Sequence, residues 1–345
     1  MNSRLPHVTG AAAAFLASAL TVPLLAFPAS AVVRPEVRYS DRNVVVGASV
    51  TARVPKSSRP DGTRLVLERQ YLDGWRPADR SAEQRDKGYV LDVPTDQFGT
   101  FTYRVVALRD NGSIASKSEQ DTVTVRPPYK PLGKPSQHVF SASPRVRWDS
   151  CQKIRWAFYS KTSPKHALRQ VREGIERVHE ATGLDFHYVG KTDQKPNPYG
   201  KGITGTDVVI GWRSAKDFRP FRKHPGTVGL GGNRYYSGFE EADGSRVSKA
   251  VRGGVVLNAS LRSQVRSGYG KGYTWGEVII HELGHVVGLA HAKASSQIMY
   301  YSVTTRNADW GAGDLAGLRM VGDTRGCLKK VSARTAPRSE RFRLP

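Results

Sequence analysis

Three histidines and a glutamate lie close together in HELGHVVGLAH, at positions 281–291 of this chain. His281 and His285 are four residues apart, so on a helix both imidazoles project from one face and can bind the same metal ion. Gly288 allows the chain to turn sharply, and His291 follows as a third nitrogen ligand. Three protein ligands with one open position are typical of a catalytic zinc site.

Glu282 follows the first histidine and supplies the carboxylate that such chemistry requires. It is placed to take a proton from a zinc-bound water during hydrolysis. The alternative is a buried helix whose histidines only form hydrogen bonds. The five matching positions within 281–291 favour the metal site over that alternative.

The element that must position these residues is predicted as a helix that begins at Thr274. Thr274 and Glu277 are three residues apart and form a capping-box pattern, which satisfies free amides at a helix start. An apolar surface would bury the helix in a core. It consists of Val278, Ile279, Ile280 and Leu283.

The motif at 281–291 resembles the extended zinc motif of the metzincin metallopeptidases. Metzincins also have a methionine-containing turn beneath the zinc, and SQIMYY at 296–301 offers Met299 for it. The segment WGAGDLAGLRMVG at 310–322 resembles the C-terminal helix of the matrixin branch, in which Asp314 would tie the helix to the turn. The resemblance implies a zinc-dependent endopeptidase with one catalytic Zn²⁺, acting on protein or peptide substrates.

Tyr301 has two candidate roles. Astacin-like and serralysin-like metzincins have a tyrosine two residues after the methionine, where its hydroxyl approaches the zinc or stabilises the oxyanion. Matrixins do not use a tyrosine there. The alternative is that Tyr301 packs on the wall of the substrate pocket, and the sequence leaves both roles open.

Residues 1–31 are predicted to be a secretory signal peptide. Arg4 provides the positive charge, residues 11–25 are apolar, and Ala29-Ser30-Ala31 is a cleavage site. No later stretch is long and apolar enough to cross a bilayer. We therefore expect a secreted protein without a transmembrane segment, extracellular or associated with the cell wall.

The chain is strongly basic, with 53 Lys and Arg against 30 Asp and Glu and a formal net charge of +23. This charge suggests attraction to an anionic cell-envelope surface, although it could serve only solubility. Nucleic acid is not an expected partner, because no helix-turn-helix, RNA-binding aromatic pattern or zinc-finger spacing is present.

Residues 35–125 are predicted to form an all-β immunoglobulin-like sandwich. Runs of β-branched and aromatic residues alternate with turn signals such as Asp73-Gly74 and Asn111-Gly112. The predicted strands are 44–54, 63–72, 89–93, 101–108 and 122–125. This accessory domain could be a stalk or folding partner, could bind substrate or envelope, or could be an inhibitory pro-region.

A Pro-rich linker at 126–146 is predicted to precede the peptidase domain at 147–327. The family resemblance implies an α+β fold for that domain, a mixed twisted sheet with the active-site helix. The expected order is a strand at 154–160, a helix from Ser163-Pro164 to Gly183, strands at 186–190 and 207–212, and a strand at 253–260. The resemblance places that last strand at the sheet edge, lining the cleft. Residues 328–345 are predicted to be a basic disordered tail.

The chain has two cysteines, Cys151 and Cys327. In an exported protein a disulfide is the expected use. The alternative is a cysteine that blocks the zinc, as in matrixin precursors, but their Pro-Arg-Cys-Gly pattern is absent. Calcium is a further candidate ligand near Asp243-Gly244, although the carboxylate spacing fits no strict loop motif.

Two rival functions remain. One is an inactive zinc protein whose β-sandwich binds the cell envelope, but Glu282 argues against it because an inactive protein has no need of the base. The other is a zinc hydrolase acting on a non-peptide bond, which only the family resemblance disfavours.

Overall fold

The computed structural model describes residues 32–79, 82–200 and 205–331. The predicted signal peptide at 1–31 and residues 332–345 of the predicted tail lie outside the described residues. From Val33 onward the described residues belong to one compact unit.

The N-terminal region consists of two β-sheets that share one hydrophobic core. The sheets have the orders β1-β3-β7-β6 and β2-β10-β8-β4-β5, with β9 paired to β8. Leu91 from the first sheet and Leu67 from the second meet in that core. The bounds are β1 (Arg38–Tyr39), β2 (Asn43–Val45), β3 (Val50–Pro55), β4 (Arg64–Tyr71), β5 (Gly74–Asp79), β6 (Glu83–Arg85), β7 (Gly88–Val93), β8 (Gly99–Leu108), β9 (Ile114–Lys117) and β10 (Asp121–Arg126).

The single strand predicted at 44–54 is wrong, because the structure divides this stretch into β2 and β3. Gly47 lies between them with a φ of 77°, in the left-handed region that favours glycine. The chain turns there, and the two strands enter different sheets. The region contains only β-strands and one 3-10 turn, η1 (Lys56–Ser58), among its described regular elements.

The C-terminal region is built on a mixed sheet with the order β14-β13-β15-β17-β16-β19, to which β12 adds by pairing with β17. β14, β13, β15 and β17 are parallel, and β16 runs antiparallel to β17. The bounds are β12 (Val146–Arg147), β13 (Ile154–Tyr159), β14 (Phe186–Thr192), β15 (Val208–Arg213), β16 (Gly229–Glu240), β17 (Arg246–Asn258) and β19 (Lys329–Lys330).

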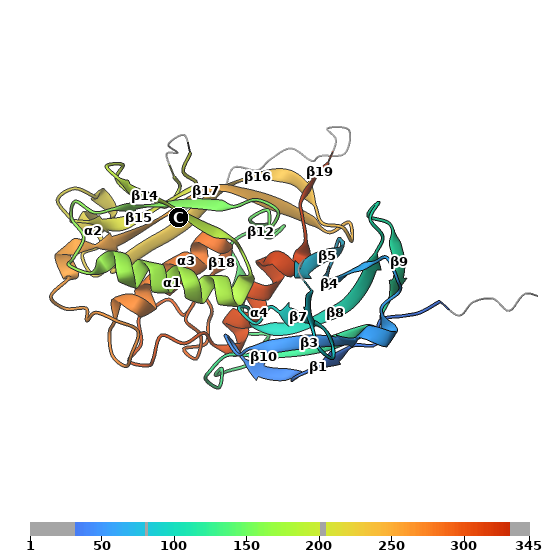
Figure 1. The fold of residues 1–345 in the computed structure, drawn as a ribbon. Helices are drawn as coiled ribbons and strands as arrows, with labels where there is room; N and C mark the ends of the chain where they lie inside the picture. Colours follow the sequence, from blue (N-terminus) through green and yellow to red (C-terminus); the bar gives the residue numbers. More distant parts are fainter. Residues whose placement is uncertain (1–31, 80–81, 201–204, 332–345) are drawn as a thin grey trace, which may run out of the picture. The chain divides into compact units, whose positions relative to one another are not determined.

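Three helices lie on one face of this sheet (Figure 1). They are α1 (Ala167–Thr182), α3 (Trp275–Val287) and α4 (Ala312–Val321). Helix α1 ends at Gly183, which has a left-handed φ of 69°. Apolar side chains of all three helices join those of the sheet in one core. The remaining elements are α2 (Arg219–Lys223), η2 (Ala259–Leu261), η3 (Asp323–Arg325) and the pair of β11 (Val139–Phe140) and β18 (Leu289–Ala290).

The expected position of the strand at 253–260 is wrong. These residues belong mainly to β17, which is an inner strand between β15 and β16. The neighbouring strand, β16, begins with the sequence GLGGNRYY. From sequence alone, a run with this many glycines favours a turn and not a strand. β16 therefore takes the place beside the active-site helix that the prediction assigned to 253–260.

The segment predicted as a linker is held against the C-terminal region. The Leu132 carbonyl accepts a hydrogen bond from the Ala312 N–H (2.8 Å), and the Ser141 N–H donates to the Gly288 carbonyl (2.9 Å). β11 and β12 also lie in this segment and pair with β18 and β17. Prolines and basic residues alone did not predict these backbone contacts.

The N-terminal sheets also contact the end of the C-terminal region directly. Asp323 accepts hydrogen bonds from Gln97 Nε2 (2.8 Å) and Arg69 Nη2 (3.4 Å). Asp73 Oδ2 accepts the Cys327 N–H (2.9 Å). Phe98, which lies between β7 and β8 and is 8% exposed, packs in the core of the C-terminal region and not in that of the N-terminal sheets.

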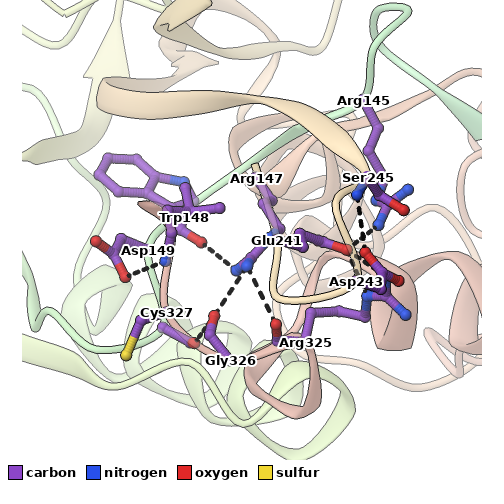
Figure 2. A network of polar contacts seen from close by, with 12 residues as sticks. Arg145, Arg147, Trp148, Asp149, Glu241, Asp243, Ser245, Arg325, Gly326 and Cys327 are labelled. Atoms are coloured by element: carbon purple, nitrogen blue, oxygen red, sulfur yellow. Dashed lines mark hydrogen bonds and ion pairs between the residues drawn. The ribbon is translucent and has the colours of Figure 1, made fainter. Parts of the chain in front are cut away.

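A buried ion cluster joins three further segments (Figure 2). Glu241, 1% exposed, follows β16 and pairs with Arg145 Nη2 (2.5 Å), Arg147 Nε (2.7 Å) and Arg325 Nε (2.8 Å). Arg147 Nη2 also donates to the Gly326 carbonyl (2.8 Å). The carboxylate therefore ties the start of β12, the β16–β17 turn and the end of η3 together.

Candidate active site

Helix α3 begins and ends at defined positions. The Thr274 hydroxyl accepts a hydrogen bond from the Glu277 N–H (3.3 Å), which caps the first turn. Gly288 ends the helix with a φ of 118°, and the chain turns back toward His291. The predicted capping box forms only in part, because the Glu277 carboxylate bonds to Thr304 and not to the helix start.

The three histidines converge at one point. Ring nitrogens of His281, His285 and His291 all lie within 4.8 Å of one another. Their ring centroids are 4.8 to 5.2 Å apart. A single small ion can contact one nitrogen from each ring at this spacing.

Backbone carbonyls orient two of these rings. His281 Nδ1 lies 2.7 Å from the Ile298 carbonyl, and His285 Nδ1 lies 2.8 Å from the Leu289 carbonyl. A carbonyl only accepts, so each Nδ1 carries the proton and each Nε2 presents a lone pair. Burial lowers the pKa of His281 to about 4 and that of His285 to about 3, which keeps both rings neutral at pH 7. Neutral imidazoles with a free Nε2 fit a zinc ion.

Glu282 lies beside the histidines and is 5% exposed. Burial raises the pKa of its carboxyl to about 8, and a hydrogen bond from the Gly231 N–H offsets part of that shift. Among the described residues the carboxylate forms no ion pair with a lysine or arginine. It is therefore held by a backbone donor and is not neutralised by a cation.

β16 approaches Glu282 closely because it has glycines on the face toward α3. A β-carbon on Gly229 would lie 2.6 Å from Glu282 Oε1, and one on Gly231 would overlap the Glu282 backbone. Neither glycine was predicted as a site residue from the sequence. Their spacing of two, which is the repeat of one strand face, was the available signal.

Met299 and Asp314 support the site from below. Met299 is 1% exposed and packs on Gly284, where a β-carbon would overlap its sulfur. Asp314 accepts hydrogen bonds from the N–H groups of Ile298 (2.5 Å), Met299 (3.2 Å) and Gly311 (2.9 Å). Burial raises its pKa to about 6, although the three donors act in the opposite direction. The carboxylate thus holds the methionine turn to the start of α4.

The three histidines and Glu282 line a cleft whose wall is β16. Residues 301–303 and residues 141–144 also line it, and no described residue before Ser141 does. One side of β16 pairs with β17, while the other pairs with β19 at Phe239 and Glu240. Among the described residues, the backbone of β16 nearer to Glu282 has no strand partner on that second side.

The sequence model of the matrixin family matches residues 147–320, which is half of the chain and contains every ligand candidate above. The chain belongs to the matrixin family. Matrixins are zinc-dependent peptidases, so this protein is a metallopeptidase hydrolase with protein substrates. A search of curated proteins finds no match to this matrixin.

Tyr301 lies at the rim of the cleft in this matrixin. Its side chain is 67% exposed, and its ring lies 4.4 Å from that of Tyr300. A hydrogen bond with the Tyr301 side chain raises the pKa of Tyr300. The described partner of Tyr301 is therefore its neighbour at the rim.

Cys151 and Cys327 are joined in a disulfide, so neither thiol is available to block the metal. Apart from a group that contains this disulfide, the histidines are the one cluster of three metal-ligand side chains among the described residues. Asp243, considered for calcium, accepts the Ser245 N–H (2.9 Å) and pairs with Arg325 (2.9 Å). None of the helices in the described ranges is long and apolar enough to cross a membrane.

Proposed function

We propose that this matrixin is a secreted zinc-dependent endopeptidase. The observation that carries the proposal is the convergence of three histidine nitrogens beside a buried carboxylate, Glu282, within a cleft. A structural zinc site would have four protein ligands and no adjacent base. Three ligands beside a base suit hydrolysis.

The roles of the residues follow from their positions. His281, His285 and His291 would hold Zn²⁺, which when bound polarises the scissile carbonyl and acidifies a water molecule. Beside the cation held by the histidines, Glu282 would be ionised, because a nearby positive charge lowers the pKa of a carboxyl. Glu282 then accepts a proton from the attacking water and delivers it to the leaving amine as the C–N bond breaks. Met299 and Asp314 act through the helix and the turn, and do not contact substrate.

An extended peptide is the substrate shape that suits this cleft. The unpartnered side of β16 offers backbone N–H and C=O groups to a peptide lying alongside it. Gly229 and Gly231 keep that strand close to Glu282, so a bound backbone would pass next to the base. Unfolded segments of proteins can adopt the required extended form.

We propose further that residues 35–125 form an immunoglobulin-like sandwich. We assign this N-terminal region a supporting role. Its contacts with Asp323 and Cys327 favour a structural partner of the peptidase domain at 147–327. An inhibitory pro-region would be expected to cover the cleft, yet among the described residues the cleft lining begins only at Ser141. Secretion is supported by the signal pattern at 1–31 and by the disulfide. The charge of +23 supports contact with an anionic envelope.

The test is to incubate the purified mature chain with a fluorescently labelled, unfolded protein. We expect cleavage that stops on chelation and returns when Zn²⁺ is added. Cleavage by protein shown to be metal-free would contradict the metal-dependent mechanism. Zinc-loaded, folded protein that leaves every unfolded substrate intact would favour the inactive or non-peptidase alternative.

A further inference from the structure

Glu277 is a buried carboxylate in the cleft that the proposed reaction does not use. It lies on α3, four residues before His281, and is 2% exposed. Its Oε1 accepts hydrogen bonds from the Thr304 N–H and Oγ1 (both 2.8 Å). Its Oε2 is fully buried and has no hydrogen-bond partner among the described residues. Half of the carboxylate thus anchors the segment after Tyr301, and half remains unsatisfied.

A buried carboxylate oxygen without a partner is costly, because it loses its water and gains nothing in return. The pKa of Glu277 is raised by burial, against the lowering effects of Thr304 and the Arg306 charge. Arg306 does not satisfy Oε2, because its guanidinium donates to the carbonyls of residues 295–297. A cationic group of a bound molecule would satisfy this oxygen.

The cleft beside Glu277 suits a long side chain with a charged end. Apolar side chains that line the cleft include Leu261, Val265, Tyr273, Val278 and Val303, with the polar Gln264 also in the lining. Val278 follows Glu277 in the chain, and Val303 precedes its hydrogen-bond partner Thr304. The arginines that line the cleft are Arg234 and Arg246, which belong to β16 and β17. Gly229 is the β16 residue that lies against Val278. Arg234 follows Gly229 by five residues, which separates the two by about 16 Å along an extended strand. Neither of these two cleft-lining arginines therefore competes for the carboxylate.

We propose that Glu277 is a specificity-determining residue that binds a lysine or arginine side chain of the substrate next to the scissile bond. The inference rests on the proposed peptidase function and adds the substrate class. The aliphatic part of such a side chain packs on the apolar walls, and its cationic end donates to Oε2. His281 is one helical turn away, so the bound side chain lies close to the bond that is cut.

The experiment uses one fluorogenic peptide and varies each of the two residues that flank its scissile bond. Each position takes lysine, arginine, norleucine or glutamate, and norleucine keeps the four-carbon chain of lysine without its charged amine. We expect the wild-type chain to have a kcat/KM about tenfold or more higher with the basic residues than with norleucine at one position. Glu277→Gln, which keeps an oxygen for Thr304, should reduce that preference to less than threefold, because kcat/KM should fall more for the lysine and arginine peptides than for the norleucine peptide. Glu176→Gln, the same change at an exposed site of α1, should retain the preference.

Each other outcome overturns the inference in a distinguishable way. Cleavage with equal or better rates for norleucine at both positions removes it and leaves the peptidase function standing. An equal loss on all peptides in folded, zinc-containing Glu277→Gln makes Glu277 a loop anchor only. Absence of cleavage with every peptide and every unfolded protein removes both proposals together.

Discussion

Glu241 and Glu282 are both buried carboxylates of the same domain, and their surroundings are opposite. Glu241 is paired with three arginines (Figure 2). Glu282 has the Gly231 N–H and, among the described residues, no cation. A carboxylate that is neutralised and fixed on all sides stabilises structure, because its charge is already compensated. One that lacks such partners and faces the cleft can exchange protons with a water molecule there, and this difference separates Glu241 from Glu282.

Glu282→Gln tests the unpaired side of this comparison and should have the largest effect. The change removes the proton acceptor and leaves the three histidines in place, so kcat should fall by about a hundredfold to ten-thousandfold. Peptide hydrolysis and metal analysis of the same preparation measure this. Wild-type turnover in a variant that still binds one zinc would show that Glu282 is not the base.

Glu241→Ala tests the paired side. It leaves three arginines near one another without their carboxylate, and Arg147 is fully buried. We expect the free energy of unfolding to fall by about 3 to 5 kcal/mol. Denaturant unfolding measures it, with Asp243→Asn as the more exposed control, for which a much smaller loss is expected because its ion pair with Arg325 is screened by solvent. Equal losses in the two variants would remove the special role of Glu241.

The ion pair of Asp96 and His179 is intermediate between the paired Glu241 and the unpaired Glu282. His179 Nε2 lies 3.4 Å from Asp96 Oδ2, and both side chains are partly exposed. A hydrogen bond with Asp96 raises the pKa of His179 to about 9 in the folded chain, from an ordinary value of 6.5. The stabilisation is therefore complete below about pH 6.5 and is lost as pH rises through about 9. The melting temperature should fall from pH 6.5 to 9.5 by more in the wild type than in Asp96→Asn. Parallel curves for the two proteins would contradict the assignment.

Tyr301→Phe should have the smallest effect. The hydroxyl lies at an exposed rim next to Tyr300, so we expect kcat to change by less than tenfold with only a modest change in KM. A loss of about a hundredfold in kcat alone would instead make Tyr301 an oxyanion donor. In that case the hydroxyl would belong with Glu282 among the groups reserved for the reaction.

The sequence predicted best those parts of the site that are local in the chain. Helix geometry determines that His281 and His285 lie on one face, and Gly288 predicts the turn that leads to His291. The same reasoning failed where contacts join distant segments. The glycines of β16 favour a turn in isolation, and only the presence of α3 against them explains a strand. Likewise, the spacing of Glu277 from Thr274 predicted a capping pair, but Thr304 competes for the carboxylate once the chain folds.

The position of Phe98 bears on how this protein unfolds. The side chain comes from the connection between β7 and β8 of the N-terminal region and completes the core that α1, α3 and α4 build in the peptidase region. Asp323 and Cys327 join the two regions again at the opposite end of the sequence. Neither core is therefore independent of the other, and a loss of packing in one spreads to the second. Calorimetry of the mature chain should record a single cooperative melting transition, with matching calorimetric and van't Hoff enthalpies.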